Sequence, residues 1–190
     1  MSYARSSLLA LLLSIPLSAA VIDRIAVVVG KTVITETEVL QEARLEAFLN
    51  QTPLDLSPQQ RKTAAERLVD QQLVRNEMHV GSYPEPAAAD VDSMLRNFRQ
   101  ENFKTEEQYR ASLEKYGVTE DQLRKYLAWQ LSAIRFTDLR FGGLASTQQS
   151  ADRVGTDGAA PKADVDQQMD AWLKETRNTT KVQFKPGAFQ

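Results

Sequence analysis

The last part of the chain contains the stretch AWLKETRNTTKVQF at residues 171–184, which carries the pattern of a helix followed by a strand. Apolar residues recur at the spacing of one helix face at Val165, Met169, Trp172 and Leu173. Val182 and Phe184 then alternate with polar residues, as in a half-buried strand. This stretch therefore predicts a closing helix and strand that fill a core shared with the beginning of the chain.

The beginning of the chain is expected to form a β-hairpin. Residues 21–29 read VIDRIAVVV and are rich in β-branched residues, and Gly30-Lys31 separates them from Thr32-Val33-Ile34. A two-residue loop that starts with glycine is typical of a tight hairpin. We expect this hairpin and the C-terminal strand to form one small sheet.

Helix-start signals predict five helices between the two ends. Capping-box spacing is present in Thr35 with Glu38, Thr105 with Gln108, and Thr119 with Gln122. Ser57-Pro58 supplies a cap followed by proline at the first helical position. The predicted helices cover residues 36–49, 58–80, 88–102, 105–117 and 119–141. The expected fold class is mainly α, a five-helix domain with a small β-sheet and a closing C-terminal helix.

Residues 1–20 are predicted to be a cleavable signal peptide. Arg5 precedes an apolar run from Leu8 to Leu17, and Ser18-Ala19-Ala20 suits a cut after Ala20. A membrane anchor is the alternative, but the run is shorter than the ~20 residues that a spanning helix needs. We expect periplasmic export without stable membrane insertion. The helical domain is predicted at 21–141, and a flexible linker rich in Gly, Ser, Ala, Gln and Asp at 142–162. Residues 163–190 are expected to complete the same domain.

Composition narrows the classes of function. The chain has 190 residues, of which 42% are hydrophobic, and this suits one domain with one real core. A net charge of -2 argues against a nucleic-acid partner, which normally needs a basic face. The absence of cysteine excludes disulfides and zinc-thiolate sites.

No catalytic, metal or cofactor site is expected. The only histidine, His79, ends the second predicted helix without a reactive partner motif, which favours a helix-end or surface role. Glu38, Glu42 and Glu46 share one helix face, which we interpret as its solvated side. Acidic pairs at other helix starts complement the helix dipole.

The aromatic residues are the most informative candidates for binding. We expect most of them to be core, and any left in a cleft would suit apolar peptide segments. The candidate peptide-contacting residues are Met94, Phe98, Phe103, Tyr109, Tyr116 and Tyr126.

The order of these features resembles the N-terminal chaperone domain of SurA-type periplasmic foldases. The similarity is carried by VIDRIAVVV at 21–29 with VITETEV at 33–39, by ERLVDQQL at 66–73, and by Tyr116-Gly117 followed by QLRK at 122–125. The closing segment, with Trp172, Glu175, Arg177 and Val182, is similar to the segment that completes that domain. The resemblance covers most of the chain after residue 20.

The resemblance implies a chaperone without its usual enzyme module. Family members carry parvulin-type prolyl isomerase domains before the closing segment, whereas the interval at 142–162 is far below the roughly 100 residues of a domain. The expected function is an ATP-independent holdase for unfolded or nascent exported polypeptides, by analogy outer-membrane proteins. A non-catalytic module for one dedicated envelope partner is the alternative, and a residual prolyl isomerase is a third possibility.

Overall fold

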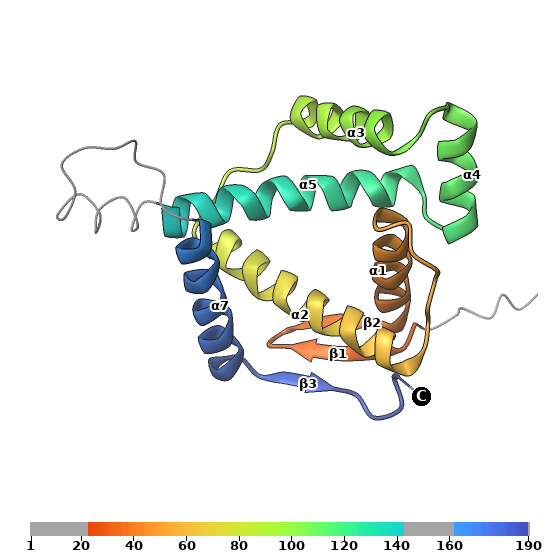
Figure 1. The fold of residues 1–190 in the computed structure, drawn as a ribbon. Helices are drawn as coiled ribbons and strands as arrows, with labels where there is room; N and C mark the ends of the chain where they lie inside the picture. The colour runs from red at the N-terminus through yellow and green to blue at the C-terminus, as the bar shows by residue number, and fades with distance from the viewer. Residues whose placement is uncertain (1–22, 143–161, 190) are drawn as a thin grey trace, which may run out of the picture.

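The computed structural model describes residues 23–142 and 162–189 (Figure 1). The predicted signal peptide at 1–20, and all but the two ends of the predicted linker at 142–162, lie outside the described residues. Along the chain, two strands are followed by five helices, a π-helical turn, a last helix and a last strand. The expected mainly α fold with a small sheet is confirmed.

The two ends of the described chain meet in one antiparallel sheet. The central strand β1 (Ile25–Val29) pairs with β2 (Thr32–Thr35) on one side and with β3 (Val182–Phe184) on the other. Gly30 turns the chain between β1 and β2 at a φ of 60°, a left-handed conformation that glycine adopts without strain. Its N–H donates to the carbonyl of Lys181 at 2.8 Å. The hairpin and the strand that closes against it were therefore predicted correctly.

Side-chain caps begin four of the five central helices. These are α1 (Glu36–Leu49), α2 (Pro58–Val80), α4 (Glu106–Tyr116) and α5 (Glu120–Thr137). Thr35 with Glu38 and Thr119 with Gln122 form complete capping boxes, so two backbone N–H groups are satisfied at each start. The remaining helix, α3 (Ala88–Asn102), begins without a side-chain cap. The five predicted helices are confirmed, apart from the end of the fifth.

The end of the fifth helix differs from the prediction. The α-helical geometry of α5 stops at Thr137, and Asp138–Gly142 continue as a π-helical turn, η1. In an α-helix, residues five apart lie on different faces, whereas the i to i+5 bonding of a π turn brings them together. Phe141 accordingly lies 6.0 Å from Phe136, ring centroid to ring centroid. The single α-helix predicted to residue 141 was wrong in its last turn.

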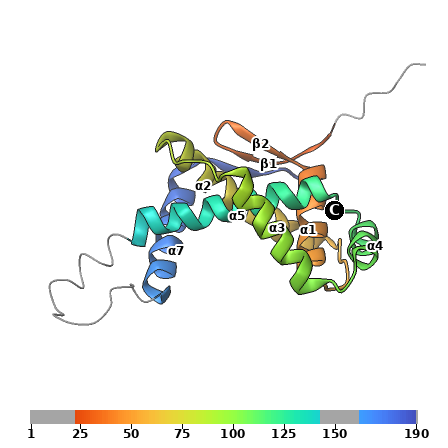
Figure 2. The same cartoon turned by 90° about the horizontal axis from the view of Figure 1, so that it is seen from above.

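The helices lie on two sides of the molecule. Figure 1 shows α3, α4 and α5 together on one side and the sheet with α1 and α2 on the other, while α7 (Lys162–Thr179) runs along one end. Figure 2 shows α3 crossing α5 when the molecule is seen from above. Contacts join α1 to α2, α3 to α5, and α7 to both α2 and η1. Within the described ranges, no helix combines the length and apolar character that crossing a membrane requires.

Buried side chains form three cores, the sheet core, the aromatic core and the closing core. The sheet core contains Ala26, Val27, Val29, Ile34, Val39, Ala43, Ala64, Ala65, Val69, Leu73 and Ala188. The aromatic core contains Leu45, Ala47, Phe48, Val91, Leu95, Tyr109, Tyr116, Val118, Leu123 and Leu127. The closing core contains Val74, Trp129, Phe136 and Phe141. Because α2 contributes Leu73 to one core and Val74 to another, it separates them.

The closing helix packs against a different surface from the one expected. Three of its side chains pack against the closing core: Val165, Met169 and Trp172. Leu173 contacts both the closing core and the sheet core, and Val182 packs on the sheet core. Phe184 remains 38% exposed at the edge of the sheet. The expectation of one core shared with the hairpin is therefore confirmed for Leu173 and Val182. It was wrong for Val165, Met169 and Trp172, which pack against the closing core, and for Phe184, which is largely exposed at the sheet edge.

Candidate functional site

The six residues predicted to contact a peptide all belong to the aromatic core or pack against it. Tyr109 and Tyr116 are only 1% and 4% exposed. Their hydroxyls donate to Glu120 Oε2 at 3.1 Å and to the carbonyl of Thr52 at 2.9 Å. In this conformation both tyrosines join structural elements and are inaccessible to a peptide. The other four are half-buried: Met94, Phe98, Phe103 and Tyr126.

The aromatic side chains of this core cover one another. Phe48 is fully buried, and its ring centroid lies 5.8 Å from that of Phe98 and 6.0 Å from those of Phe103 and Tyr116. Offset and edge-to-face contacts at such distances add to the stability gained from burial. The prediction that most of the aromatic residues are core is therefore correct for this group.

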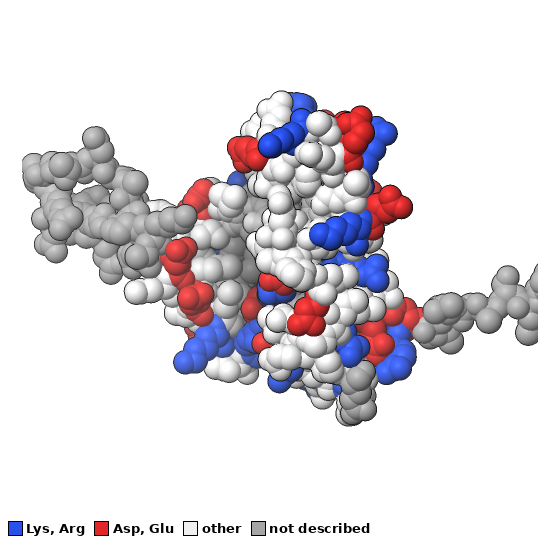
Figure 3. All heavy atoms as spheres, turned by 45° about the vertical axis from the view of Figure 1, so that its right-hand side comes forward, with Lys and Arg blue, Asp and Glu red and all other residues white. Residues whose placement is uncertain are grey.

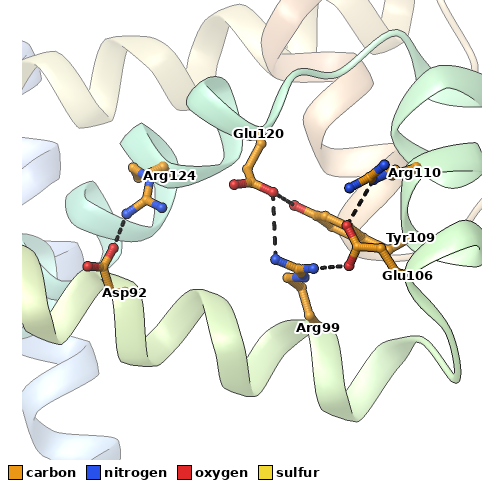
Figure 4. Close-up of polar contacts among 7 residues, drawn as sticks. All are labelled: Asp92, Arg99, Glu106, Tyr109, Arg110, Glu120 and Arg124. Atoms are coloured by element: carbon orange, nitrogen blue, oxygen red, sulfur yellow. Dashed lines mark hydrogen bonds and ion pairs between the residues drawn. The ribbon is translucent and has the colours of Figure 1, made fainter.

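A polar network holds α3, α4 and α5 together beside the aromatic core (Figure 4). Arg99 pairs with Glu106, and its guanidinium also lies 3.8 Å from Glu120 and 4.6 Å from the centre of the Tyr109 ring. Burial, reinforced by the negative charge of Glu120, raises the pKa of Tyr109 to about 12. The Tyr109 hydroxyl therefore stays a hydrogen-bond donor throughout the neutral range.

A hollow of about 350 Å³ lies next to this network. Charged and polar residues of α3, α4 and their connection surround it together with Phe103 and Tyr109. A separate ion pair, between Arg124 and Asp92, ties α5 to α3 (Figure 4). These contacts therefore join α3, α4 and α5 to one another.

A larger hollow lies between the end of α2, the connection from α2 to α3, and α5. Its volume is about 750 Å³, within the usual range of ligand pockets. We call it the α2–α5 groove, and its wall includes Arg75, Met78, Tyr83, Lys125, Ala128 and Trp129. An adjoining hollow of about 260 Å³ extends towards α1. Arg75, Lys125 and Trp129 line both hollows, so the two meet at these residues.

The groove has an aromatic surface whose parts are held in place. The Arg75 guanidinium lies 4.4 Å from the centre of the Trp129 ring. The Tyr83 ring packs 5.2 Å from that of Phe136 in the closing core. Gly81 permits this position, because a Cβ atom at residue 81 would lie 2.5 Å from the Tyr83 ring. The groove is therefore already formed in the protein alone.

A buried carboxylate lies in the adjoining hollow. The Glu42 side chain is 11% exposed, accepts a hydrogen bond from Gln71 at 3.1 Å and lies 3.8 Å from Arg67. Burial raises the pKa of Glu42, and the charge of Arg67 opposes that shift. Glu38 instead caps α1, and Glu46 pairs with Arg67. The interpretation of all three glutamates as a solvated face was wrong for Glu42, because α2 covers it.

The groove was not identified from the sequence. Arg75 and Met78 share a face of α2, as Lys125 and Trp129 share a face of α5, and helical spacing shows this much. The sequence of neither helix indicates that these two faces lie opposite each other. His79 lies exposed in the last turn of α2, as predicted, and also borders the groove. The described residues contain no group of three or more histidine and carboxylate side chains that could hold a metal ion.

Surface charge is mixed on the face drawn in Figure 3. Acidic and basic side chains alternate there with uncharged surface between them, and no large patch of one sign covers the described residues on that face.

Comparisons with known proteins add no family assignment. No protein-family model matches the chain, and no curated protein matches it significantly. The likeness to SurA-type foldases therefore rests on the sequence stretches quoted above and on their order.

Proposed function

We propose that this protein is an ATP-independent periplasmic chaperone of the SurA type. It would hold extended apolar and aromatic segments of unfolded exported proteins, outer-membrane precursors among them. The observation that carries the proposal is the preformed α2–α5 groove, where the half-buried Met78 and Tyr83 offer apolar surface to a ligand next to the buried Trp129. The sequence resemblance and the predicted signal peptide support the chaperone class and the compartment.

The lining of the groove suits varied client segments. Methionine adapts to irregular shapes, and aromatic rings offer large contact areas at a small cost in conformational entropy. Such a surface has few directional groups, so it discriminates weakly between clients. We expect Kd values on the order of micromolar, typical of a modest interface without close shape complementarity.

A matched pair of methionines tests the proposal and locates the site. Met78 borders the groove and Met94 packs on the aromatic core; both are half-buried and helical. The protein should suppress aggregation of several unrelated unfolded substrates without ATP. Met78→Gln should weaken this protection several-fold, whereas Met94→Gln should leave it nearly unchanged. Protection lost in Met94→Gln alone would instead place the client on the aromatic core.

Two further outcomes would replace the proposal. Failure to protect any substrate at several-fold molar excess, with capture of one stoichiometric envelope protein, would favour the module for a dedicated partner. Proline isomerisation of a test peptide should run at the uncatalysed rate, over about tens to hundreds of seconds. A concentration-dependent acceleration would identify an isomerase.

The predicted signal peptide has a test of its own. In N-terminal sequencing of the protein from a periplasmic fraction, the sequence read should begin at Val21.

A further inference from the structure

Arg75 occupies the place where the α2–α5 groove meets the adjoining hollow, because it lines both. Its guanidinium lies over Trp129 at 4.4 Å. Among the described residues it forms no hydrogen bond and no ion pair, although Glu42 acts on it electrostatically from further away. A guanidinium that lies over a ring keeps the N–H donors along its edge available.

The neighbouring acid groups already have partners. Glu42 accepts a hydrogen bond from Gln71 and lies close to Arg67. Lys125, the other cation at this junction, pairs with Asp121 at 2.7 Å, but the side chains of that pair are 76% and 67% exposed. Exposed pairs of this kind contribute little, so Lys125 can also turn towards a bound anion. Glu38 and Glu42 line the adjoining hollow, so an acidic ligand has to approach Arg75 from the α2–α5 groove, where its guanidinium donors have no hydrogen-bond partner among the described residues.

Charge and apolar surface are arranged in order along the groove. Arg75 and Lys125 lie at the junction with the adjoining hollow, while Met78 and Tyr83 lie away from it and Trp129 connects the two regions. Glu85, the acidic residue of the groove wall, belongs to the same connection as Tyr83. A ligand that complements this order has an apolar ring at one end and a negative charge at the other.

We propose that the α2–α5 groove recognises extended peptide segments in which an aromatic residue stands next to a carboxylate. The ring lies against Met78 and Tyr83, and the carboxylate accepts hydrogen bonds from Arg75, which is itself held over Trp129. This inference rests on the proposed chaperone function and names its class of client. Guanidinium and carboxylate match in geometry, and their charge-assisted hydrogen bonds are stronger than neutral ones.

The experiment compares two pairs of fluorescent peptides on the full-length protein by anisotropy. In each pair, two phenylalanines are flanked on one side by aspartate or by asparagine, so that the members differ only in charge. The second pair places the flanking residue on the other side. In at least one pair, the aspartate peptide should bind about tenfold more tightly at low salt, because hydrogen bonds to a charged group are stronger than neutral ones and salt screens them. If the aspartate and asparagine peptides bind the unmodified protein equally well in both pairs, the inference is overturned.

Variants then assign the preference to Arg75. Arg75→Met keeps the aliphatic contact with Trp129 and should reduce the preference to less than about twofold. Arg110→Met is the control, because Arg110 lies on α4 with a side chain 76% exposed and outside the groove wall. A preference that survives in Arg75→Met, or is lost equally in Arg110→Met, overturns the inference while aggregation protection can still stand. If no peptide binds and no substrate is protected, the chaperone proposal fails with it.

Discussion

Replacing Trp172 by alanine tests how the closing helix docks. The Trp172 ring centroid lies 5.4 Å from that of Phe136 and 6.4 Å from that of Phe141, and Arg140 lies 5.5 Å from it. Removing a fully buried tryptophan costs about 3 to 5 kcal/mol. Since Trp172 is half-buried, we expect about 2 kcal/mol. Phe184→Ala should cost about 1 kcal/mol or less, because Phe184 is 38% exposed at the sheet edge.

The two variants should be compared by thermal and urea unfolding followed by far-UV circular dichroism. For a domain of this size, 1 kcal/mol corresponds to a shift in Tm of about 2 to 4 °C. Trp172→Ala should therefore lower the Tm by about 4 to 8 °C and Phe184→Ala by at most about half as much. Trp172→Phe should recover most of the loss, because a ring still meets Phe136.

The ranking of the two variants carries the test. If Phe184→Ala destabilises the protein as much as Trp172→Ala, the sheet edge and not the closing core holds the C-terminal segment. If Trp172→Ala changes stability by less than about 0.5 kcal/mol, as ordinary surface substitutions do, α7 is not docked through this ring.

Three other changes have defined outcomes. Gly81→Ala should displace the Tyr83 ring from its site and weaken peptide binding in the anisotropy assay more than it lowers the Tm, because a Cβ would lie 2.5 Å from that ring. Because the pKa of Glu42 is raised in the folded protein, the folded state binds the Glu42 proton more tightly than the unfolded state does. The stability that this proton contributes is therefore lost as the pH rises from the ordinary glutamate pKa through the raised one. Glu42→Gln should flatten that part of the curve of stability against pH, and an unchanged slope would refute the assignment. Arg177→Met should cost about 1 kcal/mol in urea unfolding, because its side chain donates to Asp70 at 2.7 Å and to a backbone carbonyl of α2 at 2.9 Å; a double-mutant cycle with Asp70→Asn should give a coupling energy clearly above zero.

Features that depend on near neighbours in the chain were predictable. The caps at Thr35, Ser57 and Thr119 bond to groups three residues away, so their sequences alone mark where the helices begin. The hairpin follows from Gly30 for the same reason. The π turn after Thr137 was not predictable, since it places Phe141 against Trp172, which lies far away in the chain.

The candidate site depends on contacts between distant parts of the chain, which the sequence does not predict. Periodicity indicates that Tyr109 and Tyr116 point towards the interior, but it does not distinguish a residue buried in a core from a residue that lines a cleft. Their burial depends on Phe48 and Phe103, which come from other elements. The groove residues Arg75 and Trp129 are separated by 54 positions in the chain, and their contact exists only because α5 lies beside α2. Sequence spacing within either helix contains no information about that contact.

The position of α2 explains why a groove at its surface can be rigid without a ligand. Three consecutive residues point in three directions: Leu73 into the sheet core, Val74 into the closing core, and Arg75 into the groove. Leu73 and Val74 are each 2% exposed, so packing on two sides fixes the rotation of the helix about its axis. Arg75 is therefore oriented by burial of its neighbours, and a bound segment does not have to supply the cost of ordering this wall. For that reason, affinity differences between peptides that differ by one charge report contacts in the groove and not coupled folding of α2.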